Sequence, residues 1–181
     1  TGRAGYGEKL LPLCRQWDVR LIVLTHGHLD HVQNAAFLSQ QLEVPIAMHR
    51  SDLELLEDND CQPMQAHRRL GRLIQSLSRR GFQDTLLPPF QPDLYLEDGD
   101  DLSHFGVNAQ VVALPGHTLG SIGLKTEDGA LLVGDAMFRL FSPAPALVYA
   151  DRRQMEDSVA KIWALHPTAL YFGHGRPAQG L

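Results

Sequence analysis

The sequence predicts a mixed α/β fold in which sheets are covered by helices. Short apolar runs with strand character alternate along the chain with segments whose apolar residues recur at helical spacing. The chain has 181 residues, of which 44% are hydrophobic and 20% are charged, an ordinary composition for a soluble globular protein. This length suffices for one domain with its own core, so we expect a single domain over residues 1–181.

The first elements alternate between helix and strand. Residues 8–17 place apolar side chains near helical spacing, and Pro12 fits such a helix best in its first turn. The apolar run 19–24 has the character of a buried strand. Three more elements are expected before residue 60: a helix at 32–41, a strand at 44–48, and a short acidic helix at 52–57 capped by Ser51.

The longest helical segment is predicted at residues 63–80, with Gly81 as its stop signal. Its apolar residues recur at i, i+3, i+4 and i+7 and mark one face: Leu70, Leu73, Ile74 and Leu77. Five arginines crowd the same segment: Arg68, Arg69, Arg72, Arg79 and Arg80. A proline-rich linker at 87–92 follows.

The second half of the chain is richer in strands. Apolar runs predict strands at 94–96, 107–114, 121–125, 130–133 and 169–172. The Asp128-Gly129 pair is a hairpin turn signal between the third and fourth of these strands. A helix is predicted at 152–165, and Pro167 fits its stop.

Composition narrows the classes of partner and compartment. The net charge of −5 makes nucleic acid an unfavourable partner. The sequence contains neither an apolar run of membrane-helix length nor a secretory signal pattern, so we expect no membrane partner. Cys14 and Cys61 lie far apart without metal-ligand spacing, which favours a reduced, cytoplasmic setting. A single disulfide between them is the alternative. Because Thr1 is not Met, we expect a processed or incomplete start.

A cluster of metal-ligand residue types follows the first predicted strand. His26, His28, Asp30 and His31 fall within six residues. In an extended segment His26 and His28 point to the same side, whereas Asp30 and His31 project at other angles. One metal could not easily use all four groups, but two adjacent metals could. Taken alone, Asp30 could simply cap the next helix, yet burying the whole cluster without a metal would be costly.

Three further strand ends carry a residue of ligand type beside a glycine, which permits close backbone approach: His117, Asp135 and His174. Singly, each could be a turn, cap or loop residue. A strand followed by a ligand at four places indicates one shared edge of the sheets, where a site can be assembled.

Four motifs, T-H-G-H-L-D-H, P-G-H-T-x-G-S, G-D and G-H-G, resemble in this order those of the metallo-β-lactamase superfamily. The resemblance spans nearly the whole chain. It implies an αββα sandwich of two mixed sheets flanked by helices, with metals at one edge of both sheets. It also implies a ligand set, with His26, His28 and His117 on the first metal, Asp30, His31 and His174 on the second, and Asp135 bridging both.

Imidazole and carboxylate ligands suit zinc, and also iron or manganese. Two metals about 3.5–4 Å apart can hold a hydroxide that attacks a carbonyl or phosphorus, and Asp30 would orient this nucleophile or accept a proton. We therefore expect a dinuclear hydrolase with two zinc ions, acting on a small-molecule ester, thioester, lactone or phosphodiester. Two other interpretations stay open: a non-haem iron oxidoreductase of the same fold, and a metal-binding domain without catalysis.

The chain departs from the family pattern at its start. Family members begin with several strands before an Asp-Thr-Gly turn, whereas this chain opens at Thr1-Gly2. We expect those N-terminal strands to be missing. Either another chain, a second copy or a different partner, then covers the exposed sheet edge, or the sequence is a fragment of a longer protein.

A helical insertion at about 52–92 is expected between the two halves. It could cap the site and use Arg68, Arg69 and Arg72 to meet an anionic substrate, or its arginines could form a solvated face. The segment 137–149, which includes Tyr149, could line the substrate pocket or pack as an ordinary loop.

Overall fold

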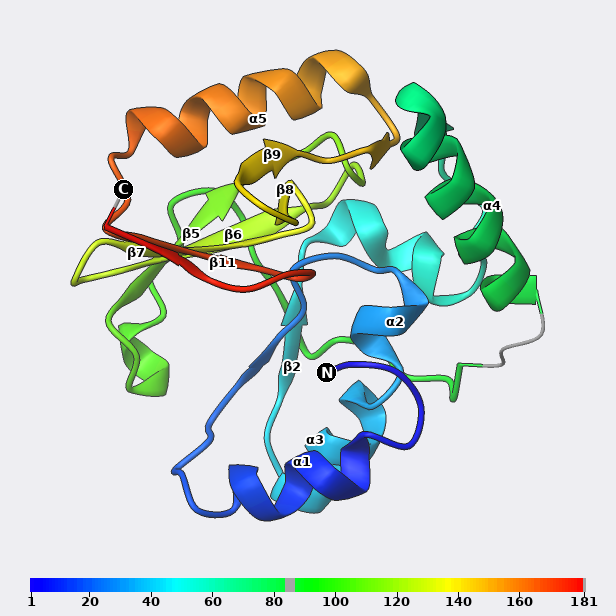
Figure 1. The fold of residues 1–181 in the computed structure, drawn as a ribbon. Coiled ribbons are helices and arrows are strands. Elements are labelled where there is room, and N and C mark those ends of the chain that lie inside the picture. The colour runs from blue at the N-terminus through cyan, green and yellow to red at the C-terminus, as the bar shows by residue number, and fades with distance from the viewer. Residues whose placement is uncertain (84–86, 181) are drawn as a thin grey trace.

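Two sheets lie face to face between helices (Figure 1). The computed structural model describes residues 1–83 and 87–180, and the side chains of residues 68 and 78–83 lie outside the description. A three-stranded parallel sheet has the order β1-β2-β4: β1 Ile22–Val23, β2 Ile46–Met48 and β4 Leu94–Tyr95. Within the described chain β1 pairs only with β2, so it forms an edge.

A five-stranded mixed sheet has the order β12-β11-β7-β6-β5. Its strands are β5 Ala109–Ala113, β6 Ile122–Thr126, β7 Ala130–Gly134, β11 Ala169–Phe172 and β12 Ala178–Gln179. The turn predicted at Asp128-Gly129 is confirmed, because it joins the antiparallel strands β6 and β7. The short 3-10 helix η2 Ser103–Phe105 precedes β5.

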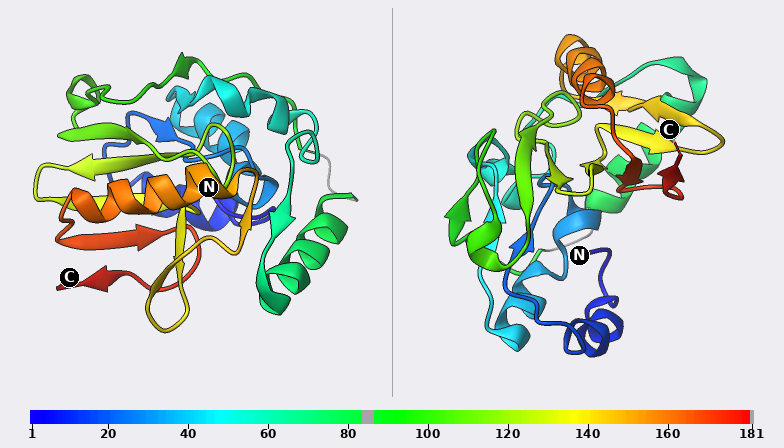
Figure 2. Two further views of the ribbon diagram at one scale, coloured as in Figure 1. Left: turned by 90° about the horizontal axis from the view of Figure 1, so that it is seen from above. Right: turned by 90° about the vertical axis from the view of Figure 1, so that its left-hand side faces the viewer.

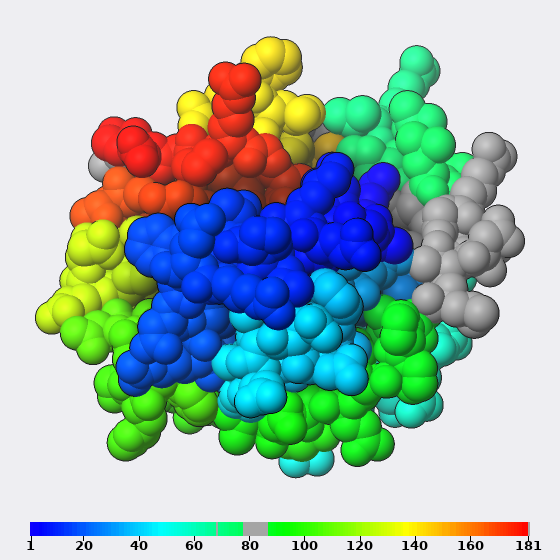
Figure 3. All heavy atoms as spheres, turned by 90° about the horizontal axis from the view of Figure 1, so that it is seen from below, coloured from blue at the N-terminus to red at the C-terminus, as the bar shows by residue number. Residues whose placement is uncertain are grey.

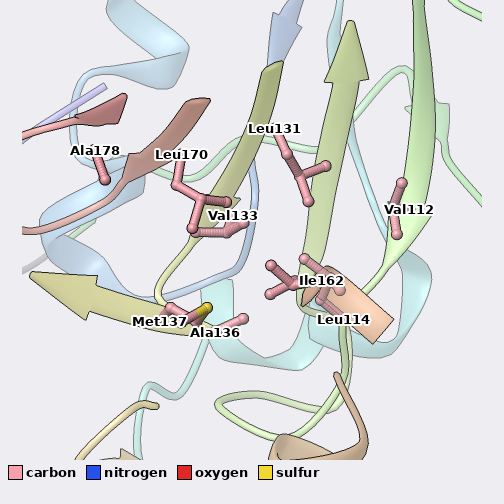
Figure 4. Packing of buried hydrophobic residues seen from close by; sticks show 9 residues of the cluster. All are labelled: Val112, Leu114, Leu131, Val133, Ala136, Met137, Ile162, Leu170 and Ala178. Carbon is pink, nitrogen blue, oxygen red and sulfur yellow. The ribbon is translucent and has the colours of Figure 1, made fainter. Parts of the chain in front are cut away.

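Three apolar layers hold the sandwich together, as an αββα arrangement requires. On the outer face of the five-stranded sheet, α5 Arg152–Ala164 buries Ile162 against strand residues such as Leu131 and Leu170 (Figures 2 and 4). Between the sheets, Ala47 of β2 packs with Val111 and with other residues of the five-stranded sheet. The third layer joins β1 and β2 to the helices beneath them, α1 Gly7–Cys14 and α3 Ala35–Leu42.

Three predicted helices in the first half have different bounds. The helix expected at 8–17 ends at Cys14, and Pro12 lies inside it rather than in its first turn. The helix expected at 32–41 is two helices, α2 Leu29–Val32 and α3, which separate at Asn34. The buried Asn34 side chain accepts from Gly7 N and donates to the carbonyls of residues 1–3, so it ties down the N-terminal segment. The prediction of Ser51 as a cap is wrong, because the 3-10 helix η1 Arg50–Leu56 begins after His49, whose Nδ1 accepts from Ser51 N.

The long helix α4 spans Arg68–Gln83 and therefore starts later than expected and continues past Gly81. The residues before it form β3 Gln65–Ala66, which pairs antiparallel with β10 Val148–Tyr149. A hairpin of β8 Met137–Arg139 and β9 Pro143–Pro145 was not predicted, since proline and short length hide the strand pattern. The apolar face of α4 is exposed: Leu70, Leu73, Ile74 and Leu77.

Cys14 and Cys61 are both free thiols. Of the helices in the described ranges, none combines the length and the apolar character needed to cross a membrane.

Candidate metal centre

The first cluster of predicted ligands lies where β1 ends and α2 begins. His26 and His28 are buried, and His28 is the N-cap residue of α2 in extended backbone. Asp30 and His31 lie inside α2, so the alternative of Asp30 as the N-cap is wrong. The change from extended chain to helix aims all four side chains into one space. The ring centroids of His26 and His31 are 4.2 Å apart, and those of His26 and His28 are 5.0 Å apart.

The other three predicted ligands follow strands that run in the same direction. β5 and β7 are both antiparallel to β6, and β7 is parallel to β11. The carboxyl ends of these three strands therefore share one edge of the sheet. His117 follows β5, Asp135 follows β7 and His174 follows β11, so the topology brings these residues together.

The seven side chains form three overlapping groups, and within each group the ligand atoms lie within 4.8 Å of one another. The groups are His26, His28 and His117; His26, His31 and Asp135; and Asp30, His31 and His174. The first and third are the two sets that the family resemblance assigns to two metals. Asp135 Oδ2 lies between them, 3.4 Å from His174 Nε2, 3.6 Å from His31 Nε2 and 3.7 Å from His117 Nε2.

The donor atoms fit a bound divalent metal. His26 Nε2 and Asp135 Oδ1 are buried and lack a hydrogen-bond partner among the described residues, which would be costly without a cation. His117 Nδ1 lies 2.8 Å from the Val148 carbonyl, which can only accept. That nitrogen therefore carries the ring proton and leaves the Nε2 lone pair facing the cluster, as second-shell partners of metal-bound histidines commonly do.

The charge state of the cluster also suits a cation. Burial lowers the pKa of His26 well below its ordinary value and lowers the pKa of His28 to about 3, so both rings are neutral at pH 7. Burial opposes ionisation of Asp30, but the hydrogen bond from His174 and the charge interactions with His31 and His174 together outweigh it and lower the pKa of Asp30 to about 2. Burial also opposes ionisation of Asp135, yet the imidazoles around it, His31 foremost, hold its pKa well below the usual range.

Gly173 makes room for the cluster at the end of β11. A Cβ at this position would collide with Asp135 Oδ1 and would lie 2.8 Å from His31 Cε1. Gly116, beside His117, has a φ of +132° and packs against the backbone of Met155 at the start of α5. At these two positions the structure needs the close backbone approach that glycine permits.

A buried carboxylate outside the predicted set holds two ligand loops together. Asp52 accepts hydrogen bonds from Gly27 N at 2.9 Å, from Gly120 N at 2.7 Å and from Thr118 Oγ1 at 2.6 Å. Gln62 Nε2 donates a fourth bond at 3.0 Å. The sequence places Asp52 in an acidic helix whose other acidic residues are exposed, so no local signal distinguishes it.

A cavity of about 790 Å³ opens over the cluster, with Asp30, His117, Asp135 and His174 in its lining. The N-terminal segment, α4 and the β8–β9 hairpin surround it (Figure 3). Part of the segment 137–149 lines this cavity through five residues: Phe138, Leu140, Ala146, Leu147 and Val148.

Three of the four residues predicted to bind substrate do not line this cavity. Arg69 and Arg72 are exposed and do not line the cavity, and the side chain of Arg68 lies outside the described residues. Tyr149 is buried, and its ring centroid lies 5.5 Å from that of His67. A role for these residues in substrate binding stays a prediction.

An αββα sandwich with a histidine- and aspartate-rich cluster at the shared strand ends defines a class of metal-binding proteins. The chain belongs to the metallo-β-lactamase superfamily, because the sequence model of that family matches residues 1–174. The fold resembles that of BLEG-1, a B3 metallo-β-lactamase, with a TM-score of 0.73, 24% identity and coverage of 96% of this chain and 79% of the other. It also resembles TTHA1623 in a di-iron-bound form, with a TM-score of 0.70, 30% identity and coverage of 95% and 79%.

Curated relatives carry hydrolase names. The chain is 28% identical to the probable metallo-hydrolase YflN of Bacillus subtilis over 91% of this chain and 67% of the relative. It is 30% identical to a hydroxyacylglutathione hydrolase of Pseudomonas putida over 96% of this chain and 54% of the relative. The chain thus spans between about half and two thirds of the length of these relatives.

Proposed function

We propose that this protein is a dinuclear metal-dependent hydrolase that acts on a small-molecule ester, thioester, lactone or phosphodiester. The observation that carries the proposal is the meeting of two three-residue ligand groups around Asp135, at the base of an open cavity. Open sites built from histidine and carboxylate are typical of catalytic metals, whereas structural zinc sites favour cysteine. The names of the relatives support hydrolysis as the reaction type.

The proposed roles follow from the two groups. His26, His28 and His117 would hold one metal; Asp30, His31 and His174 would hold the second, and Asp135 would bridge them. When bound, the metals would supply a water of lowered pKa and would stabilise negative charge on the substrate. Asp30 lines the cavity and is ionised at neutral pH, so its carboxylate can orient the attacking water and accept a proton.

We propose zinc as the native metal. The di-iron-bound relative makes iron the main competitor. Metal analysis of protein purified without added metal, together with its visible spectrum, distinguishes the two. One iron per chain without hydrolysis would support the oxidoreductase alternative instead.

The test combines metal content with a chromogenic panel of esters, thioesters, lactones and phosphodiesters. We expect two metals per chain and hydrolysis of at least one class. Asp135→Ala should lose both metal and activity, whereas Asp18→Ala should keep both, because Asp18 is an exposed residue that pairs with Arg20. Full activity in metal-free protein or in Asp135→Ala would refute the proposal.

A further inference from the structure

The wall of the cavity beside the metal cluster is built from apolar side chains. Ile74 and Leu77 come from α4, Phe138 and Leu140 come from the β8–β9 hairpin, and Leu147 precedes β10. Three separate elements thus contribute to one apolar surface. Among the side chains that the structure describes, the polar lining outside the ligand set is Arg3 and Gln33, on the side of the N-terminal segment.

A close backbone contact positions the part of α4 that reaches the cavity. Gly71 is buried, and a Cβ there would lie 2.7 Å from the Leu147 carbonyl oxygen, so only glycine lets the helix approach this closely. Ile74 lies one turn later on the same side of the helix, and Leu77 one turn after that. The anchor at Gly71 therefore directs these two side chains toward the metal cluster, whereas Arg69 and Arg72 remain outside the cavity.

Part of this apolar wall is exposed to solvent. The exposed fractions of Ile74, Leu77 and Leu140 are 38%, 58% and 64%, although all three line the cavity. Apolar side chains that stay exposed around a binding cavity gain free energy when an apolar ligand removes them from water. Histidine and aspartate side chains of the metal cluster line the same cavity. A molecule bound there must therefore also place a polar, reactive group against that cluster.

We propose that the substrate carries an unbranched apolar acyl chain, which lies against Ile74, Leu77 and Leu140 with its carbonyl at the histidine–aspartate cluster. This inference rests on the proposed hydrolase function and names the substrate as a carboxylic ester or thioester of a medium-length acyl group. Hydrolysis adds water across the acyl bond, so the products are the carboxylate that holds the chain, the alcohol or thiol, and one proton. Leu77 and Ile74 are then determinants of acyl-chain specificity.

The first measurement is kcat/KM of the metal-loaded protein on p-nitrophenyl acetate, butyrate, hexanoate and octanoate, in which only the acyl chain varies. Each buried methylene should raise kcat/KM about three- to fourfold until the chain fills the cavity. Leu77→Gln should flatten this dependence, so that the ratio of kcat/KM on the octanoate ester to kcat/KM on the acetate ester falls about tenfold or more. A flat or falling dependence in the unaltered protein would overturn the proposal.

Leu73→Gln is the matched control. Leu73 is on the same helix and is 56% exposed, almost as much as Leu77, but it does not line the cavity. It should behave as the unaltered protein on every ester. Equal effects of Leu73→Gln and Leu77→Gln would show that the helix, and not the cavity wall, is responsible, which would also overturn the proposal.

A binding measurement separates this inference from the proposed function. Octanoate should bind the metal-loaded protein more tightly than acetate by calorimetry, and Leu77→Gln but not Leu73→Gln should weaken it about tenfold or more. If no member of the ester, thioester, lactone and phosphodiester panel is hydrolysed but octanoate shows this pattern, the hydrolase function fails and the apolar acyl site stands. If esters are hydrolysed without chain-length dependence and octanoate binds no tighter than acetate, the function stands and the acyl site fails.

Discussion

Replacing Asp52 by alanine tests how much the metal centre depends on a residue that is not among the seven proposed metal ligands. Among the described residues, the Asp52 carboxylate is the acceptor for Gly27 N and Gly120 N, and both hydrogen bonds are buried. Thr118 and Gln62 each keep another partner, Ser121 Oγ and the Ser51 carbonyl, so they lose less. Each buried donor left without a partner costs about 1–3 kcal/mol, so the two amides together cost about 2–6 kcal/mol.

That loss is a large fraction of the roughly 5–15 kcal/mol that stabilises an ordinary domain. Metal affinity should fall as well, because Gly27 lies between His26 and His28, and Thr118 directly follows His117. Residues that orient metal ligands typically contribute about 10–100-fold in affinity. We expect Asp52→Ala to show a lower urea midpoint and reduced metal content that excess metal partly restores.

The assay is urea unfolding followed by metal titration, with two comparison variants. Asp52→Asn keeps one acceptor oxygen and should lose about half as much stability. Glu54→Ala, an exposed position on the same 3-10 helix, should change neither quantity. An Asp52→Ala protein with the urea midpoint and metal content of the unaltered chain would refute the reasoning.

Three further predictions concern the metal centre. Chelation should lower the thermal midpoint, since a ligand present at a hundred times its Kd stabilises the folded state by about 2.7 kcal/mol; an unchanged midpoint would contradict a bound metal. Gly173→Ala should reduce metal content because its Cβ would collide with Asp135. Gly99→Ala should retain metal, because its backbone strain at a φ of +91° is local and its Cβ would meet nothing within 4 Å. In metal-free protein the pKa of His28 is lowered to about 3, so between about pH 6.5 and pH 3 only the unfolded chain takes up its proton. Unfolding free energy should therefore fall on acidification by up to about 1.4 kcal/mol per pH unit, and His28→Gln should flatten that slope in urea titrations.

Local patterns in the sequence were sufficient to predict where the strands that carry the predicted ligands end. The run 169–172 matches β11 residue for residue, and the glycine beside each ligand marks where the backbone must approach another element. Strands can be predicted here because a short alternating or continuous run of apolar side chains is itself the signal of a partly or fully buried strand. The motifs therefore named the seven side chains that the structure brings together.

Local patterns failed wherever a distant residue decided the outcome. Asn34 interrupts a helical pattern because its side chain binds the N-terminal segment, and Asp52 is buried because two loops bring their amides to it. The apolar stripe of α4 predicts one apolar helix face but not what that face meets. Ile74 and Leu77 line the cavity, because Gly71 anchors the helix beside the metal cluster.

The sequence by itself determined the chemistry of the site, because metal ligands are defined by residue type and by their places at strand ends. Only the tertiary structure decided what surrounds that chemistry. The convergence of four loops, the role of Asp52 and the apolar wall of the cavity all arise from contacts between residues far apart in the chain. Such contacts depend on how whole elements pack, and no periodicity within one element encodes them.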